Sequence, residues 1–266
     1  MPTLPLYKVD AFASKVFRGN PAAVVPLPDW LPDELMQSIA AENNLSETAF
    51  VVRQGWDWGL RWFTPTVEVD LCGHATLATA WVIFTHLEPK MARLRFHTRS
   101  GLLTVERDGD RLVLDLPAQS PRPCAIPDGL IQALGAVPSQ TLMAADLMAV
   151  FDDPAVVRAL SPDLGGLARL QDLGIVSVVV TAPGDQDCDF VSRCFAPAQG
   201  LPEDPVTGST HCALTPYWGP RLGKTDLRAR QVSARGGDLL CRWRGDRVLL
   251  AGHAAPYFEG VIRVPR

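Results

Sequence analysis

The feature that most constrains the fold of this chain is a pair of similar segments about half a chain length apart. EVDLCGHAT begins at Glu68, and EDPVTGSTHC begins at Glu203. In each segment the glutamate comes before a glycine, Gly73 or Gly208, and the glycine opens an apolar run. A repeat of this kind predicts the same local device twice, a turn that leads into an apolar helix.

The rest of the chain reads mostly as strands. The apolar run 74–87 predicts one buried helix, and a second is expected after Gly208, where Pro216 predicts a kink or an early stop. A shorter helix in LPDELMQSIAAENN is expected to end at the Asn43-Asn44 pair. The segments 94–107 and 141–151 each read as one strand. One core helix per half among many strands indicates the α+β class.

A proline-rich stretch from Leu116 to Gly129 is the best candidate for a linker between the halves. The sequence therefore predicts an N-terminal half over residues 1–117 and a C-terminal half over 118–257. The final strand, 258–266, is a candidate to rejoin the first half.

Charge and composition point away from several kinds of partner. The formal net charge of −4 gives no electrostatic case for nucleic acid or an anionic membrane. The N-terminal residues show no secretory signal pattern, and the six cysteines are scattered without a CxxC pair, so a reducing cytoplasm is expected. The chain has no HExxH, P-loop or GxGxxG motif, so neither a metal nor a nucleotide cofactor is expected.

The two glycine turns suggest a way to hold an anion. A helix N-terminus presents unpaired backbone N–H groups and the positive end of the helix dipole, and Gly73 and Gly208 would let a ligand approach closely. A small carboxylate substrate is the natural occupant. The alternative is an ordinary helix cap, because Thr207 and Ser209 are good capping residues.

A carboxylate held in this way favours proton transfer at the neighbouring carbon, because the N–H donors stabilise the negative charge that develops. The candidates for the base are Asp204, His74 and Glu47. Glu47 and His74 also have simpler interpretations, since a glutamate at a strand edge is usually solvated and a histidine at a helix start is usually a capping or hydrogen-bonded residue.

Four segments in the same order resemble the PhzF-like family, named for the phenazine-biosynthesis isomerase and related to diaminopimelate epimerase. They are DAFASKVFRGNPAAVV (10–25), AAENNLSETAFV (40–51), FTPTVEVDLCGHATLATA (63–80) and EDPVTGSTHCALTPYW (203–218). The resemblance implies two similar halves, each a β-barrel-like sheet around a central helix, with the active site in the cleft between them. It also implies a homodimer.

The function implied by the resemblance is that of a cofactor-free, metal-free isomerase that moves a proton on a small carboxylate. Glu47 matches the glutamate that moves the proton, His74 the histidine beside the substrate, and Asp204 the assisting acid. The residues expected to hold the substrate are Ser209, Gly73, Gly208 and Asn20.

One departure from the related epimerases leaves two alternatives open. Those enzymes place two cysteines across the substrate, whereas this chain has Cys72 at one position and Thr207 at the other. The mismatch favours Glu47 for the proton chemistry. The first alternative is an epimerase, racemase or dehydratase that uses Cys72. The second is a non-catalytic protein that binds a carboxylate.

Overall fold

The computed structural model describes residues 2–185 and 187–265. Internal contacts divide the chain into two compact units, Met1–Asp115 with Ala251–Arg266, and Leu116–Leu250. The sequence predicted boundaries after residues 117 and 257, and that division into halves stays a prediction. None of the helices in the described residues is long and apolar enough to cross a membrane.

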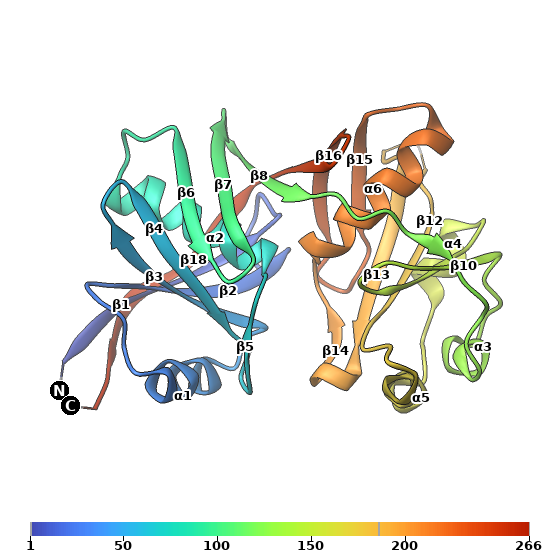
Figure 1. Cartoon of the computed structure of the whole chain (residues 1–266), viewed down its shortest axis with the longest axis horizontal. Coiled ribbons are helices and arrows are strands. Elements are labelled where there is room, and N and C mark those ends of the chain that lie inside the picture. Colours follow the sequence, from blue (N-terminus) through green and yellow to red (C-terminus); the bar gives the residue numbers. More distant parts are fainter. Residues whose placement is uncertain (1, 186, 266) are drawn as a thin grey trace. The chain divides into compact units, whose positions relative to one another are not determined.

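The first unit is a curved sheet with one helix inside it and one outside (Figure 1). Its strands follow the order β18-β1-β2-β3-β4-β6-β7-β8, with β5 beside β4. The elements are β1 (Thr3–Ala11), β2 (Asn20–Leu27), α1 (Asp33–Asn43), β3 (Glu47–Gln54), β4 (Asp57–Phe63), β5 (Glu68–Val69), α2 (Gly73–Val82), the π-helical η1 (Ile83–Leu87), β6 (Arg93–Thr98), β7 (Gly101–Asp108), β8 (Arg111–Pro117) and β18 (Ala254–Arg263).

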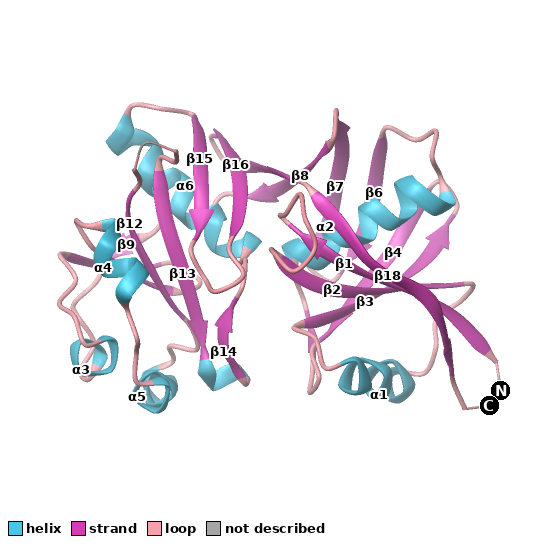
Figure 2. Ribbon diagram, turned by 180° about the vertical axis from the view of Figure 1, so that it is seen from behind, coloured by secondary structure: helices cyan, strands magenta, loops and turns pink. Residues whose placement is uncertain are grey.

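The second unit has the same plan (Figure 2). Its strands follow the order β9-β10-β11-β12-β13-β15-β16, with β14 beside β13. The elements are β9 (Arg122–Pro123), α3 (Leu130–Leu134), β10 (Gln140–Met143), β11 (Leu147–Val150), α4 (Pro154–Ala159), α5 (Leu164–Arg169), η2 (Leu170–Leu173), β12 (Val178–Pro183), β13 (Phe190–Ala196), η3 (Pro197–Gln199), β14 (Leu201–Asp204), α6 (Gly208–Leu222), β15 (Asp226–Gln231), β16 (Gly237–Arg244) and β17 (Arg247–Gly252).

The strand directions make the internal repeat explicit. β2 and β3 run parallel around α1, and β11 and β12 run parallel around α4 and α5. β3 pairs antiparallel with β4, as β12 does with β13. The crossover helix α2 joins β4 to its parallel neighbour β6, and α6 stands between β13 and its parallel neighbour β15. The predicted α+β fold with two repeated sheets around a central helix is confirmed.

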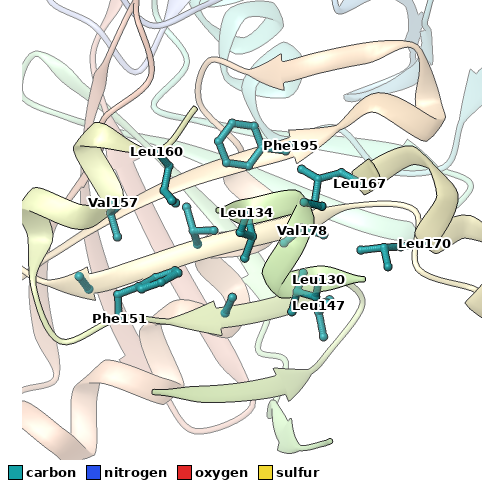
Figure 3. Close-up of a cluster of buried hydrophobic side chains, with 14 of the residues drawn as sticks. Leu130, Leu134, Leu147, Phe151, Val157, Leu160, Leu167, Leu170, Val178 and Phe195 are labelled. Carbon is teal, nitrogen blue, oxygen red and sulfur yellow. The ribbon is translucent and has the colours of Figure 1, made fainter. Parts of the chain in front are cut away.

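The alternation of side chains along the strands separates two faces of each sheet. In the first unit, Phe50 and Val52 of β3 pack under α1 in one buried cluster. In the second unit, Val178 and Val180 of β12 pack with side chains from α3, α4 and α5 in the cluster that Figure 3 shows. The opposite face of each sheet is left for the central helix.

The glutamate that opens each repeated segment is a structural anchor. Arg61 of β4 donates two hydrogen bonds to Glu68, each 2.7 Å long. Arg193 of β13 donates equivalent bonds to Glu203, 2.8 and 3.0 Å long. Each arginine also lies over the phenylalanine two residues further on, Phe63 or Phe195. These two-pronged bonds hold the start of each turn against its sheet.

The central helices agree with their prediction in place and burial, and depart from it at their C-terminal ends. The first helix is buried along nearly its whole length, and its predicted range continues past Val82 as a π-helical turn. The second continues to Leu222 through Pro216, so the early stop is wrong. Pro216 frees the Cys212 carbonyl, which accepts a 2.9 Å bond from the Gln119 N–H instead.

Two segments predicted as single strands are hairpins. The range 94–107 contains β6 and β7 with a tight turn before Gly101, where φ is 93°. The range 141–151 contains β10 and β11 with a turn at Ala144–Asp146, closed by a 3.0 Å backbone bond between these two residues. The first turn carries the pair Ser100-Gly101, a turn signal that the prediction of one strand overlooked, whereas the second turn has only Asp146 as a typical turn residue.

Candidate functional site

Glu47 and His74 lie side by side in the first unit. Glu47 is the first residue of β3, and His74 is in the first turn of α2. Glu47 Oε2 lies 3.1 Å from His74 Nε2, with the side chains 16% and 4% exposed. The two atoms meet the distance of an ion pair but not the alignment of a hydrogen bond, since neither has a hydrogen-bonded partner. Such contacts often tighten only when substrate is bound.

Asn20 contacts the His74 imidazole at the ring nitrogen that faces away from Glu47. Its Nδ2 lies 3.1 Å from His74 Nδ1, and both residues are buried. With the amide in this orientation, Nδ2 donates to an unprotonated Nδ1, so the neutral ring carries its proton on Nε2, facing Glu47. Gly19, with φ of 65°, comes just before β2, which begins at Asn20, and a Cβ at Gly19 would lie 2.1 Å from the Ala11 carbonyl oxygen.

Cys72 is the residue just before α2 and is 5% exposed. Its Sγ lies 3.5 Å from His74 Nδ1. Burial, with the nearby charge of Glu47, raises the pKa of the Cys72 thiol to about 11. The thiol therefore stays protonated at neutral pH, and this makes Cys72 a poor base there.

Opposing effects act on the pKa of the His74 imidazole. Burial lowers its pKa, but the negative charges of Cys72 and Glu47 outweigh that effect and raise it well above the usual value. Because the Cys72 thiol is neutral below about pH 11, the Glu47 carboxylate is the group that supports an imidazolium at neutral pH. The pair is therefore suited to share and move a proton.

The same three residues form a possible metal-ligand set. One donor atom each from Glu47, Cys72 and His74 lies within 4.8 Å of the others, and carboxylate, thiolate and imidazole are ligands that zinc accepts. The two ring nitrogens, however, face different partners, Nε2 toward Glu47 and Nδ1 toward Cys72 and Asn20. An ion bound to one ring nitrogen could reach the donor on the other side of the imidazole only if that side chain moved around the ring. The fit is poor, and the expected absence of a metal stays a prediction.

Asp204 and Thr207 form a tight turn in the second unit. The Thr207 hydroxyl donates to Asp204 Oδ2, and the Thr207 N–H donates to Gln231 Oε1 over 2.8 Å. Gln231 Nε2 donates to the Asp204 carbonyl oxygen over 2.7 Å. Gln231 is fully buried, so it fixes the path of the chain into α6. Sequence reasoning missed Gln231 because it lies far along the chain from this turn, on β15.

His211 is held in the neutral state. Its Nδ1 donates a 2.7 Å bond to the Thr207 carbonyl oxygen, and its ring packs on Phe190. Burial lowers the His211 pKa to about 4. His211 is therefore neutral at physiological pH and works as a packing residue in the first turns of α6.

The structure gives a direct answer on the capping alternative. Neither Cys72 nor Thr207 accepts a hydrogen bond from the helix it precedes. The Thr207 hydroxyl is directed to Asp204 instead. Gly73 and Gly208 are buried at the helix starts, and Ser209 is partly buried beside Gly208. The N–H groups of the first turns are therefore not used by these N-cap side chains.

The predicted site residues thus fall into two groups. The first unit brings together Asn20, Glu47, Cys72, Gly73 and His74, and the second brings together Asp204, Thr207, Gly208 and Ser209. Their catalytic and binding roles stay predictions.

Comparison with known proteins places the chain among isomerases. A family model described as phenazine biosynthesis-like protein (PhzC-PhzF) matches residues 9–260. A Pseudomonas aeruginosa protein named an uncharacterized isomerase is 55% identical over 261 residues, which cover 98% of this chain and 99% of the relative. The crystal structure of an Enterococcus faecalis PhzF family protein matches with a TM-score of 0.94 at 47% identity, covering 99% of this chain and 100% of that one.

A more distant solved structure shares only the fold. A hydroxyproline epimerase from Agrobacterium vitis matches with a TM-score of 0.64 at 11% identity, covering 98% of this chain and 92% of that one. The repeated fold and the named relatives together define an enzyme of the isomerase class. The chain belongs to the PhzF family of phenazine biosynthesis-like proteins, as its four motifs indicated.

Proposed function

We propose that this protein is a cofactor-independent isomerase that moves a proton on a small carboxylate substrate, with Glu47 as the general base and acid. The observation that carries the proposal is the contact between Glu47 Oε2 and His74 Nε2, 3.1 Å apart and largely removed from solvent. A carboxylate beside an imidazole can take a proton from carbon and give it back at another carbon without a metal or an organic cofactor.

The starts of α2 and α6 supply the proposed binding groups. Both helices begin at a glycine, and neither N-cap side chain occupies the first-turn N–H groups. Backbone donors of this kind bind a carboxylate and stabilise the charge that grows on it when a neighbouring C–H bond breaks. That both helices serve one ligand stays a prediction, as do the homodimer and the cytoplasmic location.

The direct test is hydrogen exchange with solvent. The protein is incubated in deuterated water with a panel of small unsaturated and 2-substituted carboxylates, and deuterium uptake and double-bond position are followed by NMR. We expect deuterium at one carbon and migration of hydrogen for at least one compound. Binding of a panel compound without exchange would instead support the carboxylate-binding protein.

The competing mechanism uses Cys72 as an acid–base group, as in an epimerase, racemase or dehydratase. Its position at the helix start and its 3.5 Å contact with His74 Nδ1 favour this candidate. Its raised thiol pKa, about 11, weighs against it, because the thiolate would be scarce at neutral pH.

Replacing Cys72 with alanine distinguishes the two mechanisms. Under the Glu47 mechanism we expect Cys72→Ala to keep kcat/KM within about threefold of the wild type, because only a small buried side chain is lost. A cysteine base would lose about 10²-fold or more, and wild-type activity would rise toward pH 11 as the thiolate forms. Cys72→Ser is the matched control for size, and kcat/KM across pH 6–11 is the measurement.

A further inference from the structure

The hairpin formed by β6 and β7 reaches back to the segment that leads into α2. We call residues 68–72 the entry segment, and Arg99 with Ser100, between the two strands, the hairpin tip. Arg99 Nη2 lies 2.6 Å from Glu68 Oε2, the same oxygen that the arginine of β4 contacts. The Ser100 hydroxyl donates a 2.8 Å bond to the Asp70 carbonyl oxygen. The entry segment is therefore held both by β4 and by the hairpin tip.

The second unit repeats the serine contact. β15 has the place of β6, because each is the parallel strand that follows the central helix of its unit. Ser100 is the second residue after β6, and Ser233 is the second residue after β15. The Ser233 hydroxyl donates a 2.8 Å bond to the Pro205 carbonyl oxygen. Asp70 and Pro205 each lie two residues after the glutamate that opens the repeated segment, so the same bond joins equivalent atoms in both units.

The hairpin tip is itself fixed in shape. The Thr98 hydroxyl donates a 2.7 Å bond to the Gly101 carbonyl oxygen and accepts a 3.2 Å bond from the Ser100 N–H. Gly101 has a φ of 93°, which suits a tight turn and which other residues rarely adopt. Because the turn is already closed by these bonds, the contact between the hairpin tip and the entry segment costs little additional ordering.

The position of His74 depends in part on the entry segment. Residues 70–72 belong to no helix or strand, and Cys72 makes no side-chain capping bond to α2. His74 lies in the first turn of this helix, whereas Glu47 belongs to the sheet. The 3.1 Å distance between Glu47 Oε2 and His74 Nε2 therefore depends on the path by which the chain enters α2.

We propose that Arg99 and Ser100 are positioning residues for the proton transfer proposed above, because they hold the entry segment so that His74 stays beside Glu47. The inference rests on the proposed function for its kinetic consequence, and every residue in it belongs to the first unit. Arg99 is 52% exposed and Ser100 is exposed, so replacing them releases the entry segment without opening a cavity in the core. Both residues act through His74 rather than on the substrate.

The direct test needs no substrate. The Glu47 carboxylate helps to raise the pKa of the His74 imidazole, and this effect weakens with distance. We expect Arg99→Met/Ser100→Ala to show a lower His74 pKa than the wild type in an NMR titration of the imidazole signals. The loss of a positive charge alone would act in the opposite direction. Ser100→Thr keeps the hydroxyl and should keep a His74 pKa near the wild-type value. An unchanged His74 pKa in the double variant overturns the proposal.

The matched control is Arg95→Met/Ser38→Ala. Arg95 is also 52% exposed, lies on the same hairpin and pairs with Asp57 over 3.7 Å. Ser38 is an exposed serine that donates a 2.7 Å bond to the Glu34 carbonyl oxygen within α1. This control loses the same two kinds of side chain elsewhere in the first unit, so it should leave the His74 pKa unchanged. An equal fall in both double variants would contradict the proposal.

The kinetic consequence is measured as hydrogen exchange on a compound that the wild type converts. We expect kcat/KM to fall about threefold in Ser100→Ala and about 10-fold in Arg99→Met/Ser100→Ala, because small misplacements of reacting groups slow catalysis. Ser100→Thr should return to within about twofold of the wild type. A lowered His74 pKa with wild-type kinetics would support the hold on His74 but contradict the proposed function.

Discussion

Replacing Glu47 with glutamine lowers kcat/KM by about 10²- to 10⁴-fold, the range for a lost general acid–base group. Glutamine keeps the size of the side chain and its place beside His74, but it cannot accept the substrate proton. The side chain is 16% exposed, so the substitution leaves the core intact. The measurement is steady-state kinetics, with deuterium exchange on any compound that the wild type converts.

Two variants sharpen this result. Glu42→Gln is the control, because Glu42 is an exposed glutamate on the neighbouring α1 and should leave kinetics and stability unchanged. Glu47→Asp keeps the charge but withdraws the carboxylate by one methylene, so it should retain exchange at a reduced rate. Unchanged kinetics in Glu47→Gln would show that another group removes the proton.

Replacing Arg193 with methionine should destabilise the second unit by about 2 to 4 kcal/mol, as expected when one partner of a largely buried ion pair is removed. Arg193 is 12% exposed and donates to both oxygens of Glu203. It also donates to the carbonyl oxygens of Val157 and Leu160 at the end of α4, 3.2 and 2.6 Å away. Methionine fills the space but leaves these acceptors without their donor.

The measurement is the free energy of unfolding in urea, with Arg158→Met as the matched control. Arg158 is 39% exposed and pairs with a half-exposed aspartate, so its loss should cost less than about 1 kcal/mol. The double variant Arg193→Met/Glu203→Gln should recover part of the loss, because it removes the unpaired charge. A change below about 1 kcal/mol for Arg193→Met would contradict the anchoring role of this pair.

The sequence carried more information about the repeat than about the chemistry. The glycine at each helix start and the apolar runs could be predicted, because helix burial and turn residues leave a local pattern, and four motifs in the same order carried the family resemblance. The hairpin turn at Ala144–Asp146 could not be predicted, because only Asp146 is a typical turn residue there, and neither could the route of α6 past Pro216. That route depends on a backbone donor, Gln119, about a hundred residues away.

In the candidate site, too, the sequence indicated individual residues, whereas the structure was needed to show their contacts. Glu47, His74 and Cys72 were nominated individually, but their mutual contacts and their protonation depend on burial between β2, β3 and α2. Gln231 carries no recognisable motif, and only the folding of β15 beside this turn brings its side chain to Thr207 at the start of α6. Spacing along the chain cannot predict such groups, because hydrogen bonds between strands join residues that are distant in sequence.

The sequence alone determined the two helix starts, which follow from local hydrophobic pattern and glycine placement, and the family with its two similar halves, which follow from the resemblance of four motifs. Only the tertiary structure shows what the first glutamate of each repeated segment contacts. Glu68 and Glu203 each accept two hydrogen bonds from an arginine, because each lies beside the strand that carries its arginine.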